Sequence, residues 1–219
     1  MLKNDFKKEV ENTLDLIYEE VDKSLSDKDY DEARKTINKG LKSLVGLDIE
    51  TIDIFSFEGI AEMIDRENQY NSGKYIAFGC LMKLMGIVCS KTSEDTSYIV
   101  YFEKALDGFY KAFSEDDDID EKYNEDAEDV CKELSKFDLS IDIDKKVLKL
   151  YEAVNKFDKA EDTLFYMLQK TENDGSIILE GMKFYNRLKA KDKEILKEGN
   201  LPYEEVEDGI AELERRLGL

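Results

Sequence analysis

Two stretches of the chain are similar: SDKDYDEARKTINKGL at residues 26–41 and AVNKFDKAEDTLFYML at residues 153–168. In each, an aromatic residue follows a short polar segment, an alanine comes three residues later, and large apolar residues stand four and eight positions after the alanine. Apolar residues at this spacing lie on one face of a helix, and a small residue there lets a neighbouring helix come close. We therefore predict two antiparallel helical hairpins with Ala33 and Ala160 at helix crossings. The aligned pairs are Tyr30 with Phe157, Asp31 with Asp158, Ala33 with Ala160, Thr36 with Thr163, Ile37 with Leu164 and Leu41 with Leu168.

The second stretch and the residues before it resemble the tetratricopeptide repeat. That family has a tyrosine late in the first helix, an aromatic residue at the turn, and a small residue followed by an aromatic in the second helix. Tyr151, Phe157 and Ala160 match these positions, and Leu164 replaces the last aromatic. The resemblance implies an array of stacked helical hairpins, which is an architecture that typically binds other proteins.

The first stretch departs further from the repeat. Tyr30 and Ala33 match, but Ser24 stands where the family has tyrosine. Neither stretch has the tryptophan–leucine–glycine opening or the closing proline, and their offset is not a multiple of the roughly 34-residue repeat. The expected fold is therefore all-α, with antiparallel hairpins stacked as an irregular, right-handed, tetratricopeptide-like array. The C-terminal third also resembles an uncharacterised family of Gram-positive bacteria.

The composition excludes several classes of function. The 219 residues carry a formal charge of −20, which repels nucleic acid and anionic membranes and favours basic partners. Histidine is absent, so hydrolases with a histidine base and histidine-ligated metal sites are excluded. The charged, amphipathic N-terminus lacks the apolar core of a signal peptide, which predicts a cytoplasmic protein.

Apolar residues at helical spacing recur along most of the chain. The segment Asp48–Phe55 has no clear period, and we expect a loop or short turn there. The acidic run 115–140 predicts a solvated helix and loop that connect an N-terminal half, 1–114, to a C-terminal half, 141–219; one continuous domain, 1–219, is the alternative. The expected helices span residues 4–25, 30–45, 57–64, 74–90, 96–113, 119–137, 143–154, 157–170, 178–188 and 203–217.

No metal or cofactor site is expected. A calcium loop starting at Asp116 would place Glu121 where glycine is needed and Ala127 where a bidentate glutamate is needed. The three cysteines have no metal-binding spacing, and we expect buried, reduced thiols.

Two groups of residues are candidates for partner binding. Tyrosine gives contact area at a low entropy cost, and four tyrosines lie in the aromatic- and methionine-rich segment 75–113. A basic island, Lys183–Lys197, could dock an acidic segment. The candidates are Tyr75, Tyr98, Tyr101, Tyr110, Lys183, Tyr185 and Arg187.

The leading hypothesis is a non-catalytic helical scaffold that binds a protein or peptide, and the acidic charge suits a basic partner. One alternative is a histidine-independent enzyme that uses buried carboxylates. The other is a homo-oligomeric structural protein in which the basic island of one copy meets the acidic run of another.

Overall fold

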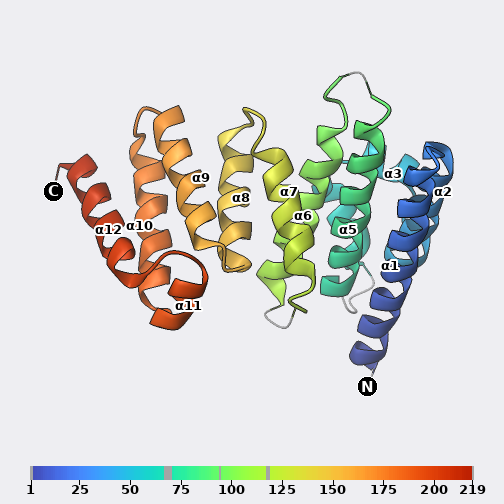
Figure 1. Cartoon of the computed structure of the whole chain (residues 1–219), viewed down its shortest axis with the longest axis horizontal. Coiled ribbons are helices and arrows are strands. Elements are labelled where there is room, and N and C mark those ends of the chain that lie inside the picture. The colour runs from blue at the N-terminus through green and yellow to red at the C-terminus, as the bar shows by residue number, and fades with distance from the viewer. Residues whose placement is uncertain (1, 67–70, 94, 117–118, 219) are drawn as a thin grey trace. The chain divides into compact units, whose positions relative to one another are not determined.

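The structure is a computed structural model that describes residues 2–66, 71–93, 95–116 and 119–218, with side chains for all of these except 2–5. Every regular element in the described residues is helical, which confirms the predicted all-α class. The chain forms two compact units, Met1–Phe137 and Asp138–Leu219. Figure 1 labels most helices of both units.

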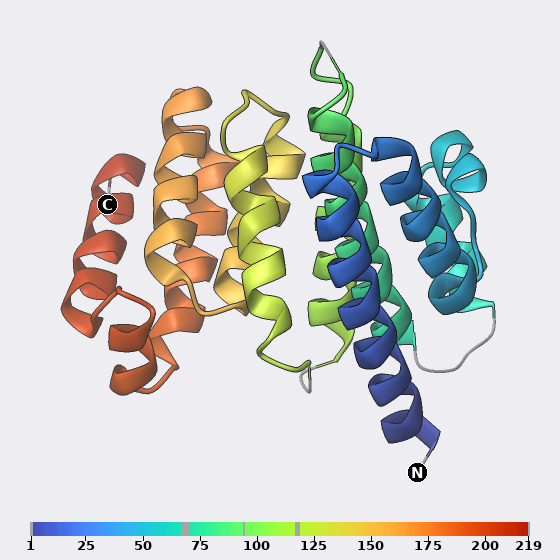
Figure 2. The same ribbon diagram turned by 45° about the vertical axis from the view of Figure 1, so that its right-hand side comes forward.

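The first unit is built around one apolar helix, α5. Helices α1, α2, α6 and α7 all pack against it, and α1 and α2 form the first predicted hairpin. Figures 1 and 2 both show α5 and α6 side by side. The helices of this unit are α1 (Leu2–Ser26), α2 (Tyr30–Gly40), the π-helical turn η1 (Leu41–Val45), α3 (Ile49–Ile54), α4 (Phe57–Asp65), α5 (Asn71–Ser90), α6 (Ile99–Glu115) and α7 (Tyr123–Leu134).

In the second unit, each long helix packs against the next along the chain: α8 on α9, α9 on α10, and α10 on α12. The short helix α11 falls inside the basic island, where the sequence showed no helical period. The helices are α8 (Ile141–Ala153), α9 (Phe157–Lys170), α10 (Gly175–Lys189), α11 (Lys193–Glu198) and α12 (Tyr203–Leu217).

The turns of the two predicted hairpins have the same backbone conformation. Lys28 and Asn155 both adopt positive φ, at 59° and 56°. In each turn the next residue donates its backbone N–H to the carbonyl five residues earlier, which is the Schellman pattern of helix ends. These bonds are Asp29 to Ser24 at 2.8 Å and Lys156 to Tyr151 at 2.8 Å. Ala33 and Ala160 are both fully buried.

Helix α5 is central because it is apolar on every side. Among the described residues it is the one helix long and apolar enough to cross a membrane by length and composition, but 78% of its most apolar window is buried inside the first unit. Burial of a helix all round is expected when no polar face is available. The prediction of a central, buried helix in this region is therefore confirmed.

Helices α5 and α6 approach closely through glycines. A Cβ atom added to Gly79 would lie 3.0 Å from the ring of Phe109, and one added to Gly86 would lie 2.8 Å from the ring of Phe102. From the other side, a Cβ on Gly108 would lie 3.2 Å from the backbone nitrogen of Gly79. The missing Cβ atoms therefore set the distance between the two central helices.

Some helix boundaries differ from the sequence prediction. Asp48–Phe55 is not a loop, because Asp48 accepts the Thr51 N–H at 3.0 Å and starts α3, and Ile52 is fully buried. Helix α7 of the acidic run packs against α5 and α6, and the first unit extends to Phe137. Gly46 ends its helix with φ 81°, as predicted.

Candidate partner-binding site

Two of the seven candidate binding residues are wrong, because their side chains are buried. Tyr75 is fully buried on α5, and its hydroxyl donates to the Asp65 carboxylate at 3.0 Å. Tyr185 is also fully buried, and its hydroxyl donates to Glu161 at 2.5 Å. Both rings are buried, and a carboxylate accepts the hydrogen bond from each hydroxyl. Both tyrosines are therefore core residues.

The other three tyrosines are half-buried on or next to α6. The ring of Tyr98 meets the rings of Phe102 and Phe137 edge-on, with centroids 6.2 and 6.4 Å away. The hydroxyl of Tyr101 donates to the Asp53 carboxylate at 3.1 Å. Tyr101 is thereby joined to α3, whose end carries exposed apolar side chains, whereas Tyr110 lies further along α6.

The basic island binds within its own unit. Arg187 makes a two-point ion pair with Glu152, at 2.8 and 2.7 Å. Lys189 lies 3.6 Å from Glu207, and the Lys193 ammonium lies 4.6 Å from the ring centre of Tyr203. Lys183 is exposed and lies 3.9 Å from Glu180. Most of the island's charge is therefore used inside the second unit.

Exposed large apolar side chains of the first unit lie at the end of α3 and on α6, while Leu16 on α1, 62% exposed, lies apart from them in the sequence. Ile54 is 78% exposed, and Phe55 and Val100 are each 43% exposed. Two hydrogen bonds join the end of α3 to α6, so these side chains stand on neighbouring helices. Exposed apolar surface on neighbouring helices makes a candidate interaction site. We call Ile54, Phe55, Val100 and Tyr101 the apolar corner.

Two contacts fix the apolar corner to the helices beneath it. The Lys104 ammonium donates to the backbone carbonyl of Phe55 at 2.9 Å, where α3 ends and carbonyls lack helical partners. The hydrogen bond from Tyr101 to Asp53 joins the same two helices. Val100 lies one turn before Lys104 on the same face of α6. The backbone that carries the exposed side chains is therefore held in place before any partner arrives.

The corner is strongly acidic. Burial lowers the pKa of Lys104, even though four nearby carboxylates act to raise it: those of Asp53, Glu58, Glu103 and Asp107. Four carboxylates thus lie near this ammonium, and the Arg34 guanidinium is a second cation near Tyr101. Among the described residues, this arrangement gives the apolar corner a negative rim.

The sequence did not predict this corner, because Asp48–Phe55 shows no clear helical period. One signal was present: an aspartate three residues before a threonine, ahead of an apolar run, is typical of a helix start. Exposure of Ile54 and Phe55 had no sequence signal, because apolar residues in a short helix are usually buried.

A second cluster of polar side chains joins α1, α5 and α7 in the interior of the first unit. The Lys83 ammonium, on α5, lies 2.6 Å from the Asp126 carboxylate and 3.1 Å from that of Asp129, both on α7. Tyr18, on α1, donates to Asp126 at 2.8 Å. Lys83 is only 8% exposed, so this polar network ties the acidic helix to the core.

The network does not contain an activated nucleophile. Burial and the charge of Asp126 raise the pKa of the Cys80 thiol well above its ordinary value. Burial alone would lower the pKa of Lys83, but Asp126 and Asp129 outweigh it and raise the pKa. Burial also raises the pKa of Tyr18. A protonated thiol, ammonium and phenol are poor nucleophiles, so we assign the network a structural role.

We expect the protein to lose stability above pH 10, the ordinary pKa of tyrosine. Burial raises the pKa of Tyr18 and Tyr185 in the folded state, so above pH 10 these residues ionise in the unfolded chain but stay neutral in the folded one. Each such group lowers the free energy of unfolding by about 1.4 kcal/mol per pH unit. Denaturant unfolding between pH 8 and 11 measures this loss.

The variant Tyr18→Phe tests the origin of that loss. It removes one of the ionising groups, so its unfolding free energy should fall less steeply above pH 10 than that of the unchanged protein. Equal slopes for both proteins would contradict the assignment to Tyr18.

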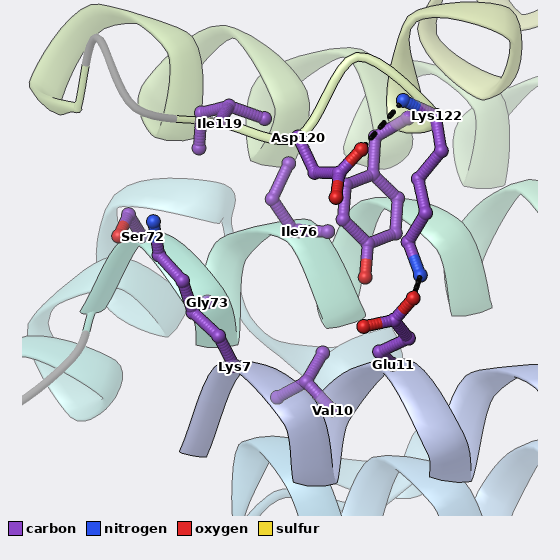
Figure 3. Close-up of a pocket in the computed structure, with 10 residues that line it drawn as sticks. Lys7, Val10, Glu11, Ser72, Gly73, Ile76, Ile119, Asp120 and Lys122 are labelled. Atoms are coloured by element: carbon purple, nitrogen blue, oxygen red, sulfur yellow. Dashed lines mark hydrogen bonds and ion pairs between the residues drawn. The ribbon is translucent and has the colours of Figure 1, made fainter. Parts of the chain in front are cut away.

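A small pocket lies between α1, α5 and the segment that leads into α7 (Figure 3). Val10, Ile76 and Ile119 give it apolar walls. At its rim Lys122 pairs with Glu11 at 2.6 Å, and the carboxylate of Asp120 accepts the backbone N–H of Lys122 at 3.0 Å. The open volume of about 70 Å³ is well below the roughly 300–1,000 Å³ of small-molecule sites. This space suits a few waters or one small apolar group.

Two carboxylates with a raised pKa lie in the second unit. Burial raises the pKa of Asp144, which lies 3.4 Å from the Lys170 ammonium. Burial also raises the pKa of Glu161, which accepts the hydrogen bond from Tyr185. Among the described residues, histidine, cysteine, aspartate and glutamate form no group that could hold a metal ion, and all three cysteines are free and buried. Residues 117 and 118 of the rejected calcium loop lie outside the described residues.

Comparison with known proteins gives a family but no activity. No curated protein and no solved structure matches the chain. One family model does match, and it covers residues 1–218 rather than the C-terminal third alone. The chain therefore belongs to the family of unknown function DUF6483.

Proposed function

We propose that the protein is a non-catalytic, cytoplasmic helical module that binds another protein through the apolar corner of its first unit. The observation that carries the proposal is the exposure of Ile54, Phe55 and Val100 on helices that side-chain hydrogen bonds hold in place. A surface that is already ordered loses little conformational entropy on binding, and large apolar side chains supply most of the favourable free energy.

The architecture supports the same function. We propose that the hairpins stack within each unit as an irregular, right-handed, tetratricopeptide-like array. The matching turns at Lys28 and Asn155 and the burial of Ala33 and Ala160 support this relation. Stacked hairpins present side chains of successive helices on one continuous surface, which suits the binding of a protein or peptide.

The two alternative functions have weaker support. A homo-oligomer built from the basic island and the acidic run would need cations that already pair within the second unit, as Arg187 does with Glu152. An enzyme with paired carboxylates would need them to converge in a cavity, but Asp144 and Glu161 contact Lys170 and Tyr185 instead. The binding hypothesis therefore explains more of the observed contacts.

The proposal predicts a complex with a partner protein whose affinity depends on Ile54. The protein should form a stoichiometric complex with a partner from its own cells, and this complex should be re-formed from the two purified components. Ile54→Ser should weaken the re-formed complex at least tenfold, because a buried isoleucine contributes about 1.5–3 kcal/mol. Calorimetric titration of the partner with each variant measures the change.

The matched control is Leu179→Ser, which removes a 55% exposed leucine from α10 in the second unit. It should leave the affinity unchanged. Equal affinity for the unchanged protein and the Ile54→Ser variant would contradict binding through the apolar corner.

A further inference from the structure

The charges around the apolar corner distinguish among the partners that an apolar surface could accept. Asp53, Glu58, Glu103 and Asp107 lie close enough to Lys104 for each to act on its ionisation. Asp53 and Glu58 are exposed, whereas Glu103 and Asp107 are half-buried. An approaching segment therefore meets large exposed apolar side chains and, near them, exposed carboxylates.

A second copy of this chain is a poor occupant. In a symmetric dimer each corner would face another corner, so the same carboxylates would oppose each other. The formal charge of −20 adds repulsion at longer range. The same charges disfavour an anionic membrane surface. A neutral apolar segment would gain no favourable electrostatic interaction with the carboxylates.

From these contacts we propose that the apolar corner binds a basic amphipathic segment of a partner protein. The apolar side chains of the segment cover Ile54, Phe55 and Val100, and its lysines or arginines lie beside Asp53, Glu58 and the neighbouring carboxylates. This inference rests on the proposed protein-binding function and adds the chemical class of the partner.

The two parts of the surface have different roles in this binding. The apolar side chains supply the affinity, because their burial removes apolar area from water. The carboxylates select the charge of the partner and accelerate its approach, and salt weakens this effect because it screens exposed charges. The affinity should therefore fall with rising salt concentration, whereas the dependence on Ile54 should persist at high salt.

The test uses the full-length protein and synthetic peptides. One labelled peptide carries leucines along one helical face and lysines along the other, and a second replaces every lysine by glutamate. In fluorescence anisotropy the lysine peptide should bind at least tenfold more tightly than the glutamate peptide, and this difference should shrink at high salt.

Variants locate the binding on the protein. Ile54→Ser should weaken the lysine peptide about tenfold, and Asp53→Asn should weaken it several-fold while it keeps an acceptor for the Tyr101 hydroxyl. The controls are Leu179→Ser and Asp142→Asn, which change exposed side chains of the second unit and should have no effect. Circular dichroism checks that every variant keeps its helices.

The possible outcomes separate this inference from the proposed function. If both peptides bind equally and Ile54→Ser weakens both, the charge preference is wrong, but protein binding through the corner stands. If the lysine peptide does not bind, or binds unchanged to the Ile54→Ser variant, the inference is overturned. The complex with the natural partner then tests the proposed function by itself.

Discussion

Lys83→Met should lower the free energy of unfolding by about 3–5 kcal/mol, because it leaves a buried carboxylate without its cation. Lys83 is 8% exposed, and its ammonium lies 2.6 Å from Asp126 and 3.1 Å from Asp129. Methionine keeps the length and apolar character of the side chain, so the main change is the lost charge. Denaturant unfolding followed by circular dichroism measures the effect.

Two further variants make this test specific. Lys132→Met removes a lysine that pairs with Glu128 and Asp129 but is 51% exposed, so it should cost no more than about 1 kcal/mol. Adding Asp126→Asn to Lys83→Met removes the unpaired charge and keeps an acceptor for the Tyr18 hydroxyl, so it should restore part of the loss. Equal costs for Lys83→Met and Lys132→Met would contradict a buried ionic link between α5 and α7.

Gly108→Val should destabilise the first unit by about 3 kcal/mol, at the upper end of the cost of overpacking. A Cβ at this position would lie 2.8 Å from the ring of Phe78 and 3.2 Å from the backbone nitrogen of Gly79 and the carbonyl of Tyr75. Backbone atoms cannot rotate away as a side chain can, so α5 and α6 would have to separate. Thermal and denaturant unfolding measure the loss of stability.

The same substitution at Gly175 is the control. This glycine starts α10, and a Cβ added there would meet no atom within 4 Å. Gly175→Val should therefore change stability by no more than about 0.5 kcal/mol. A similar loss for both variants would show that valine in a helix, rather than the close approach of α5 and α6, causes the effect.

Several parts of the fold were predictable because they depend on local spacing. Val10, Leu14 and Val21 repeat at the helical period, and all three are buried in α1. Gly46 ends its helix in the left-handed conformation that glycine adopts most easily. The alignment of residues 26–41 with 153–168 predicted two turns with one backbone geometry. Such features need only the neighbours along the chain.

The candidate binding residues were harder to predict, because exposure depends on distant parts of the chain. Tyr75 belongs to a helix that is apolar all round, and such a pattern does not say which side meets other helices. Helices α1, α2, α6 and α7 cover α5, so Tyr75 became a core residue. Ile54 had the opposite outcome: its short helix packs through Ile52 and leaves Ile54 in solvent.

The amino-acid sequence by itself determined the all-α class, the two sibling hairpins and the excess of negative charge. Local backbone preferences, apolar periodicity and composition decide these properties, and none of them requires knowledge of long-range contacts. Only the tertiary structure decided that glycines set the spacing of α5 and α6, that Lys83 joins α5 to α7, and that Ile54, Phe55 and Val100 stay exposed on two joined helices. These features arise between residues 16 to 49 positions apart, where packing rather than local spacing determines which side chains meet.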